Sequence, residues 1–250
     1  MGMTSLYGVG MASTAALIEK LEASSLDKTP GSLNAKRWGM YIDMDKIQAE
    51  DSKRIIDACH SIHNVPNFGN PKDEIKWIWL EEFGHAFPEQ EDKYLAEEME
   101  HKKVLLLCNH CDAPACVKVC PTKATFKRKD DGLVLMDYHR CIGCRFCMAA
   151  CPYGARSFNY FDPRPHVKNP NPRFPTRMIG VVEKCTFCSE RLDKGLPPAC
   201  AEASNGAIVF GDLLDESSEI RKLLKENYTF RRKPEVGTRP GLYYRIGVGG

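Results

Sequence analysis

The pattern of apolar and polar residues in this chain of 250 residues is broken into short pieces. Apolar residues within 39–47 and 104–107 predict two short strands, and the second has the composition of a buried strand. Residues 50–59 (EDSKRIIDAC) have the spacing of a helix. Residues 162–175 contain five of the sixteen prolines and predict an extended loop. We therefore expect short elements joined by long loops.

Three further segments complete the expected organisation. Apolar residues 124–126 and 133–135 flank Lys129-Asp-Asp-Gly132, which predicts a hairpin. The heavily charged segment 88–103 predicts an amphipathic helix with a solvated face. An aromatic stretch before the charged segment is expected to form core or a surface for a partner, and it consists of Trp77, Trp79, Leu80 and Phe83.

The beginning of the sequence differs from the rest. Residues 1–18 carry no charged side chain and are rich in Gly, Ala, Ser and Thr, as in the apolar part of an export signal. Because the basic residues that precede such a part are missing, a small-residue helix that packs on a partner is the alternative. The segment is too weakly apolar for a membrane span. Residues 24–36 have the composition of a linker.

Composition and charge exclude one class of partner. Thirty-five basic and 33 acidic residues give a formal net charge of +2. Such a balance lacks the basic footprint of a nucleic-acid-binding protein, so we expect no nucleic-acid partner. The length allows one large domain or two small ones with real cores.

Eight of the twelve cysteines stand in two runs that each end in Cys-Pro. The second run has the spacing C-x2-C-x2-C-x3-C-P, in which three thiolates hold one [4Fe-4S] cluster and the fourth reaches a neighbouring cluster. The first run has two more residues before its third cysteine. Short intervals let one tight loop reach three irons of a cluster. The runs contain Cys108, Cys111, Cys116 and Cys120, and Cys141, Cys144, Cys147 and Cys151.

Two other chemistries use closely spaced cysteines. Structural zinc takes pairs of C-x2-C and has no use for a third nearby thiolate followed by Cys-Pro. A disulfide framework would need separate bridges, which cysteines in tight runs do not favour. Both remain alternatives to an iron-sulfur protein.

A third group of cysteines is incomplete. Cys185 and Cys188 are followed, after a loop, by Cys200. The usual interval from Cys200 leads to Ser204, whereas counting back from the apolar residues 207–210 leads to Ala203. No fourth cysteine closes this run.

An internal repeat accounts for the remaining cysteine. Residues 39–47 resemble residues 132–141, and Ile47 stands where the later copy has Cys141. The helical segment that follows supplies a single cysteine, Cys59. Cys59 therefore stands alone in this copy.

These motifs resemble the iron-sulfur electron-transfer subunits of membrane oxidoreductases related to dimethyl sulfoxide reductase, nitrate reductase and formate dehydrogenase. The resemblance covers roughly residues 37–244, including RCIGCRFCMAACPYG at 140–154, KCTFC at 184–188 and the tail from Pro234. Residues 202–206 (EASNG) are most similar to the exported iron-sulfur subunit of the membrane complex associated with dissimilatory sulfite reductase, which implies a role in sulfur metabolism. The next most similar is the subunit of the quinone reductase complex of sulfate reducers.

The resemblance implies an α+β fold of two interlocked ferredoxin-like modules with pseudo-twofold symmetry, long loops and one degenerate cluster site. The implied division has an N-terminal signal-like or anchoring segment with a linker, a discontinuous module with one cluster, a module with two clusters, and an extended tail. These parts cover residues 1–36, 37–103 with 176–225, 104–175, and 226–250.

Members of this family have four cysteine runs, the first interlocked with the fourth and the second with the third. The four cysteines absent here are then the full ligand set of one cluster, and three [4Fe-4S] clusters remain. A buried free thiol at Cys59, with a three-cysteine [3Fe-4S] site at the last run, is the alternative. The implied sets are Cys108, Cys111, Cys116 with Cys151; Cys141, Cys144, Cys147 with Cys120; and Cys185, Cys188, Cys200 with Cys59.

The implied function is electron transfer without catalysis of its own, between a polytopic quinone-interacting membrane subunit and another redox subunit such as a multihaem cytochrome c. In the family, the missing cluster faces the molybdenum subunit and the second and third runs face the membrane subunit. A soluble polyferredoxin and an iron-sulfur subunit of a molybdopterin oxidoreductase are the alternatives. We expect the chain to be peripheral to the membrane on the exported face, with the cytoplasmic face as the alternative.

The residues next to the cysteines suggest how the sites are insulated and tuned. Apolar neighbours are expected to exclude water, namely Val117, Ile142, Phe146, Met148 and Phe187. Basic neighbours either raise the reduction potentials or form solvated surface, namely Lys118, Lys123, Arg140, Arg145 and Arg156. His110 and His139 are expected to pack beside ligands without being ligands.

Overall fold

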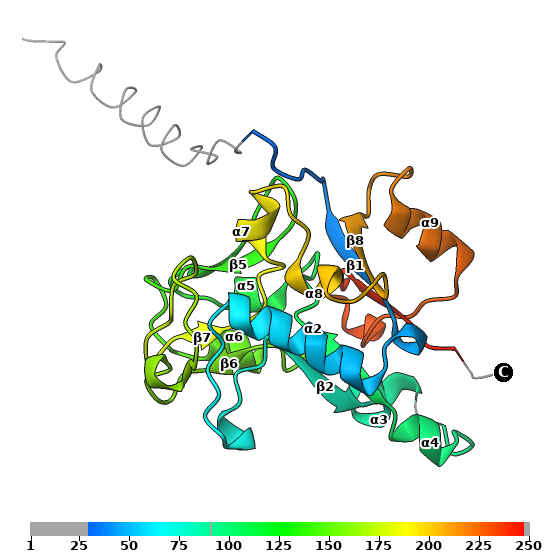
Figure 1. Cartoon of the computed structure of the whole chain (residues 1–250), viewed down its shortest axis with the longest axis horizontal. Coiled ribbons are helices and arrows are strands. Elements are labelled where there is room, and N and C mark those ends of the chain that lie inside the picture. Colours follow the sequence, from blue (N-terminus) through cyan, green and yellow to red (C-terminus); the bar gives the residue numbers. More distant parts are fainter. Residues whose placement is uncertain (1–29, 91, 248–250) are drawn as a thin grey trace, which may run out of the picture.

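The computed structural model describes residues 30–90 and 92–247 (Figure 1). Its strands are short and fall into four small sheets. They are β1 (Trp38–Asp43), β2 (Ile78–Glu82), β3 (Lys103–Leu107), β4 (Thr125–Lys127), β5 (Val134–Met136), β6 (Ser157–Phe158), β7 (Val182–Glu183), β8 (Ile208–Asp212) and β9 (Leu242–Arg245).

Most of the described helices are single turns. The α-helices are α2 (Ala49–Ile62), α3 (Phe83–Ala86), α4 (Glu97–Glu100), α5 (Ala115–Lys118), α6 (Phe146–Ala149), α7 (Ser189–Leu192), α8 (Ala199–Glu202) and α9 (Glu219–Glu226). The 3-10 helices are η1 (Met44–Lys46), η2 (Pro71–Asp73), η3 (Pro88–Gln90), η4 (Arg164–His166) and η5 (Pro234–Val236).

The largest sheet joins the two ends of the described chain. β1 lies in its centre, antiparallel to β8 and parallel to β9, with Met40 opposite both Phe210 and Leu242. Every residue of β1 is buried, because α9 lies against β1 and β8 and the rest of the core covers the sheet. A strand covered in this way has to be apolar over most of its length, as the sequence of β1 is.

Helix α2 delivers the isolated cysteine to the core. A capping box between Gln48 and Asp51 fixes its beginning, and its buried side includes Ile55 and Cys59. The helix lies against β2 and α8, as Figure 1 shows. The core beneath it includes Trp77, which is 1% exposed.

Several expected elements are confirmed. The strand expected within 39–47, the helix expected at 50–59 and the buried strand at 104–107 are β1, α2 and β3. The predicted hairpin is present, because β4 pairs antiparallel with β5 and Phe126 lies opposite Leu135. In the aromatic stretch, all but Leu80 are buried, which identifies it as core.

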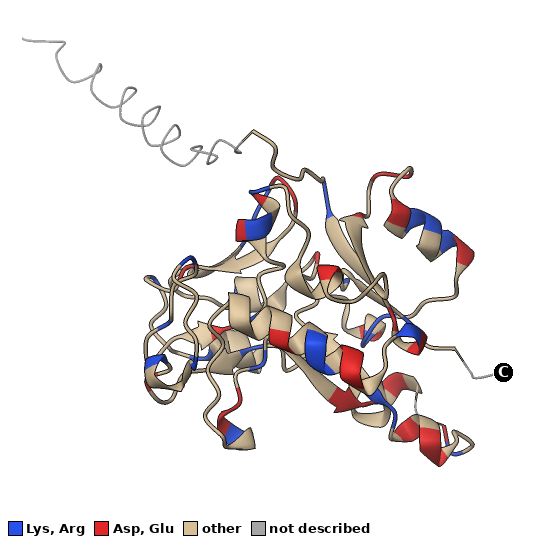
Figure 2. Cartoon of the chain, in the orientation of Figure 1, with Lys and Arg blue, Asp and Glu red and all other residues tan. Residues whose placement is uncertain are grey.

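The helix predicted for residues 88–103 is wrong. Among its described residues, the segment contains η3, the single turn α4 and the first residue of β3. The residues of η3 and α4 are all at least partly exposed. Figure 2 shows that acidic residues gather on α4 and at the end of β2. Short helices are marginal without an apolar face to bury, and repulsion among Glu97, Glu98 and Glu100 opposes extension of this one.

The signal-like segment at residues 1–18 lies outside the described residues. Among residues 30–90 and 92–247, no helix is long and apolar enough to cross a bilayer.

A buried ionic network joins the core to the loops. The Nε atom of Arg177 lies 2.7 Å from Glu183 Oε2, and both side chains are almost completely buried. The indole of Trp77 donates to the same carboxylate oxygen at 2.9 Å, and the amide of Asn159 donates to the other. Arg177 also donates to the backbone carbonyl of Asn64 at 2.8 Å. The carboxylate therefore holds β7, the core and the proline-rich loop region together.

We expect Glu183→Ala to lower the free energy of unfolding by about 3–5 kcal/mol, because it leaves the Arg177 guanidinium buried without a counter-charge. Urea unfolding followed by circular dichroism measures this. Glu81→Ala is the control, since Glu81 pairs with an exposed histidine and its loss should cost less than about 1 kcal/mol. Equal losses of unfolding free energy in the Glu183→Ala and Glu81→Ala variants would contradict the role of Glu183 as the counter-charge of Arg177.

Candidate iron-sulfur sites

Each of the three cysteine runs turns through the left-handed region two residues after its first cysteine. The residues there are His110 (φ 39°), Gly143 (φ 69°) and Phe187 (φ 55°). Histidine and phenylalanine rarely adopt this conformation, and such strain is retained where a site requires it. A tight turn of this kind points successive backbone N–H groups into one concavity, which suits an anionic group. The three runs therefore form the same local structure despite their different spacing.

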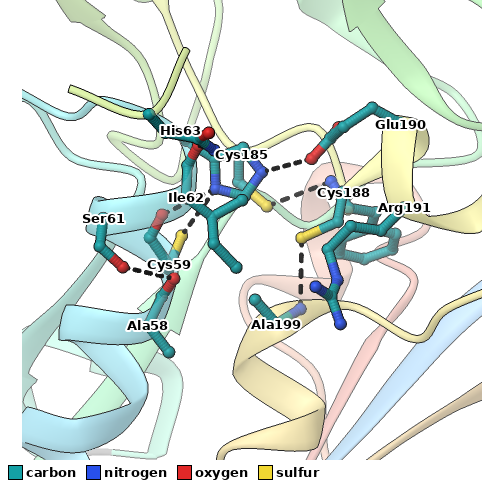
Figure 3. A network of polar contacts seen from close by, with 12 residues as sticks. Ala58, Cys59, Ser61, Ile62, His63, Cys185, Cys188, Glu190, Arg191 and Ala199 are labelled. Carbon is teal, nitrogen blue, oxygen red and sulfur yellow. Dashed lines mark hydrogen bonds and ion pairs between the residues drawn. The ribbon is translucent and has the colours of Figure 1, made fainter. Parts of the chain in front are cut away.

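The first set of thiols is built around Cys59. Cys59, Cys185, Cys188 and Cys200 are all buried. Burial raises the pKa of Cys59 well above the usual thiol range, and Cys188, Cys185 and Cys200 raise it further as neighbours. The structure thus brings the isolated cysteine of α2 to the incomplete run, as Figure 3 shows.

The second set joins the two central runs. Burial raises the pKa of Cys111 to about 12, and the neighbouring thiols of Cys108, Cys151 and Cys116 act in the same direction. Cys151 comes from the end of the following run, after α6. Four cysteines from two runs therefore surround one point.

The third set lines a small cavity. Cys120, Cys141, Cys144 and Cys147 lie on its wall with Val182. Burial raises the pKa of Cys120, but donation from the backbone N–H groups of residues 122, 124 and 125 outweighs it and lowers the pKa. These donors favour a thiolate at Cys120.

The three sets lie in a row. Cys108 of the second set and Cys185 of the first set are electrostatic neighbours. At the other side, the buried guanidinium of Arg156 neighbours both Cys116 of the second set and Cys147 of the third. The second set is therefore in the middle.

Polar groups around the sets fit anionic metal clusters. Lys184 is completely buried, and its Nζ donates to the carbonyls of Val134 and Cys185, with no carboxylate within 4 Å among the described residues. The Asn109 amide and the Thr186 hydroxyl, each next to a set, are buried without a partner. Unpaired buried cations and donors are costly, and sulfide and thiolate sulfurs would satisfy them. Four buried thiols with raised pKa values likewise call for a metal that stabilises their thiolates.

His110 fills the space between the middle set and the Cys59 set. It stacks on Phe187 with ring centroids 3.7 Å apart. Its Nδ1 accepts from the Val134 backbone N–H at 3.1 Å, so its Nε2 carries the proton and donates to the Cys185 carbonyl at 3.1 Å. Burial lowers its pKa well below the ordinary value, which keeps the ring neutral. It packs beside ligands as expected, whereas His139 is exposed.

A second histidine escaped the sequence analysis. His63 lies one turn after Cys59 on the same side of α2, with its Nδ1 3.7 Å from the Cys59 sulfur. Its Nε2 lies 2.9 Å from a carboxylate oxygen of Glu190, as Figure 3 shows. Ligand atoms of His63, Cys188 and Glu190 lie within 4.8 Å of one another. Because both ring nitrogens already have protein partners, His63 holds the site together rather than ligating a metal. The i, i+4 spacing from Cys59 was the available signal.

The expected apolar insulation is wrong at two positions. Ile142 and Phe146 are 66% and 60% exposed, whereas Phe187 is buried. The tight turn of the third set projects these two side chains outward, because the cysteines point inward. A large exposed apolar group is informative because it marks a surface that a partner covers.

Comparisons with known proteins agree with this geometry. The family described as 4Fe-4S dicluster domain matches residues 101–162, and a second family of the same description matches residues 140–210. The chain is 41% identical to the Hdr-like menaquinol oxidoreductase iron-sulfur subunit 1 of Archaeoglobus fulgidus, over 84% of this chain and 83% of that protein. It is 38% identical to the menaquinone reductase iron-sulfur cluster-binding subunit of Nitratidesulfovibrio vulgaris, over 83% and 88%. It is 35% identical to the arsenate respiratory reductase iron-sulfur subunit of a Shewanella species, over 83% and 95%.

We expect Gly143→Ala to remove one cluster, or about four irons per chain, because the new Cβ would lie 2.4 Å from the Gly180 carbonyl oxygen. Iron and acid-labile sulfide analysis measures this. Gly154→Ala is the matched control, since it has a similar φ of 63° and no atom within 4 Å of the new Cβ. If the Gly143→Ala and Gly154→Ala variants had the same iron content, close packing of the Gly143 loop against Gly180 would be ruled out.

Proposed function

Because this chain belongs to the family of 4Fe-4S dicluster iron-sulfur subunits found in menaquinol, menaquinone and other respiratory oxidoreductases, we propose that it carries electrons within a quinone-linked membrane complex. The observation that carries the proposal is the row of three four-cysteine sets, each drawn from two segments of the chain. When bound, each [4Fe-4S] group takes up and releases one electron. The polypeptide performs no bond chemistry, and it sets the order, insulation and potential of the clusters.

We assign the twelve cysteines to three clusters, with four ligands each. The central runs exchange their last cysteines, so that Cys151 serves the second set and Cys120 the third. Cys59 replaces the missing last cysteine of its partner run. Each exchange lies within one proposed module, since Cys120 and Cys151 both belong to residues 104–175, and Cys59 and Cys185 both belong to residues 37–103 with 176–225. The exchanges are the basis for the proposed pseudo-twofold relation of the two modules and for this domain division.

The end at the third set is proposed to face the quinone-interacting membrane subunit. An apolar outer face surrounds this set, with exposed fractions of 47% to 66%, and consists of Ile142, Phe146, Tyr160, Phe161, Met178 and Ile179. Contacts join its loops, because Arg145 donates to the Tyr160 hydroxyl at 3.2 Å and the Gly180 N–H donates to the Asn159 carbonyl at 2.9 Å. Such a face is suited to a large apolar interface next to a cluster.

The opposite end is proposed to face a different redox subunit, such as a multihaem cytochrome c. The cluster absent here is the one that faces a molybdenum subunit in the family, so direct transfer from such a subunit would have to reach the Cys59 set. We place the chain at the membrane surface through its partners, on the exported face.

Elemental analysis tests the ligand assignment. We expect about twelve irons per chain and broad absorption near 400 nm, since each cluster holds about four irons. Cys59→Ala should lower the iron content to about eight, or to about eleven if a [3Fe-4S] group forms. Ser61→Ala is the control on the exposed side of the same helix. Zinc in place of iron, or unchanged iron in the Cys59 variant, would refute the assignment.

The docking face has its own test. Phe146→Glu should reduce the fraction of the chain retained on washed membranes of the native host about tenfold, because it places a charge in an apolar interface. Leu214→Glu is the control, since Leu214 is 63% exposed between β8 and α9, outside this face. If both variants were retained on the membranes, the proposed docking face would be excluded. This result would not affect the assignment of the clusters.

A further inference from the structure

Of the five basic residues near the cysteine runs, one differs from the rest. Arg156 is 5% exposed, whereas Lys118, Lys123, Arg140 and Arg145 are exposed. Water and salt screen exposed charges strongly and buried charges weakly. Arg156 is therefore the member of this group with the strongest expected effect on the clusters.

The partners of Arg156 are almost all sulfur atoms. Its Nη2 donates to Cys116 Sγ at 3.1 Å and to Thr125 Oγ1 at 2.7 Å, and its Nη1 lies 3.2 Å from Met136 Sδ. Cys147 is an electrostatic neighbour of the guanidinium, and Thr125 and Met136 line the same cavity as Cys147. Cys116 belongs to the middle set and Cys147 to the third set. One guanidinium thus contacts a proposed ligand of one cluster and lies next to the site of the other.

No carboxylate lies within 4 Å of this guanidinium in the part of the chain that the structure describes. A buried guanidinium without a counter-charge is strongly unfavourable, and arginine does not lose its proton. The cysteine sulfurs on either side are therefore its counter-charge.

The side chain is held in this position. Thr125 accepts from Arg156 and donates its own hydroxyl proton to the Leu135 carbonyl at 3.1 Å, which ties the guanidinium to the β4–β5 hairpin. Arg156 itself stands one residue before β6, whose pairing with β7 fixes its backbone. Neither side chain can rotate away without leaving a buried polar group unpaired.

We propose that Arg156 is a positioning residue that raises the reduction potentials of the middle and third clusters together. This rests on the cluster assignment above. Reduction adds negative charge to a cluster, and a fixed cation beside both clusters stabilises both reduced forms. Raising both potentials together keeps them matched, so that transfer between the two clusters stays nearly balanced in either direction.

The test is an EPR-monitored redox titration of the iron-loaded full chain. In the Arg156→Gln variant, reduction of the middle and third clusters should become at least tenfold less favourable, which makes each of their reduction potentials about 59 mV more negative. The reduction potential of the cluster at the Cys59 set should not change. Arg156→Lys keeps the charge and should cause a smaller shift. Arg140→Gln is the matched control, because Arg140 is 67% exposed beside Cys141 and pairs with Asp137.

Three results would overturn the proposal. One is an unchanged pair of potentials in the glutamine variant. Another is a shift confined to one cluster. The third is loss of the two clusters in both Arg156 variants, which would show that Arg156 is needed for assembly of the clusters and not for setting their potentials. Iron content separates these outcomes from failure of the assigned function, since about twelve irons in the parent chain support the assignment whatever the potentials do.

Discussion

Convergence of thiols from distant segments is the constraint on which the rest of the fold depends. Cys59 on α2 meets Cys185 and its run, although more than a hundred residues separate them. Regular structure is sparse around these sites, and β6 and β7 are two residues long. The apolar core around Trp77 supports only part of the molecule. In the loop-rich part, metal ligation takes the place of a hydrophobic core, as in other small metal-binding domains.

The second requirement is charge balance. Two buried cations, Arg156 and Lys184, lie next to cysteines of the sets, and neither has a carboxylate partner within 4 Å among the described residues. By contrast, Arg177 has its own carboxylate in Glu183 and needs no cluster. Arg156 and Lys184, which lie beside the cysteine sets, therefore differ from Arg177 in having no acidic partner within 4 Å among the described residues.

Local sequence determined what could be predicted. Cysteine spacing, the helix at α2 and the hairpin of β4 and β5 depend on neighbouring residues, and each was expected where the structure has it. The hydrogen bond of Lys184 to the Val134 carbonyl joins residues far apart in the chain, so no local pattern could indicate it. For His63, the spacing from Cys59 indicates that the two residues are close, but no local pattern indicates its contact with Glu190. The charged segment failed for the opposite reason, since a helical pattern does not make a long helix when little of it, chiefly Leu95 and Met99, packs against the core.

The region of the missing cysteine run has become ordinary core. Met44 and Ile47 are 2% and 8% exposed and belong to the main hydrophobic cluster. Ser204, which with Ala203 is one of the two candidate positions of the other absent ligand, donates its hydroxyl proton to the Ala201 carbonyl at 2.7 Å and accepts from the Ile208 N–H at 2.9 Å. If a cluster site were lost and no side chains filled its space, a cavity or unpaired polar groups would remain. Because these residues are packed and hydrogen-bonded, they support the proposal of three clusters over four.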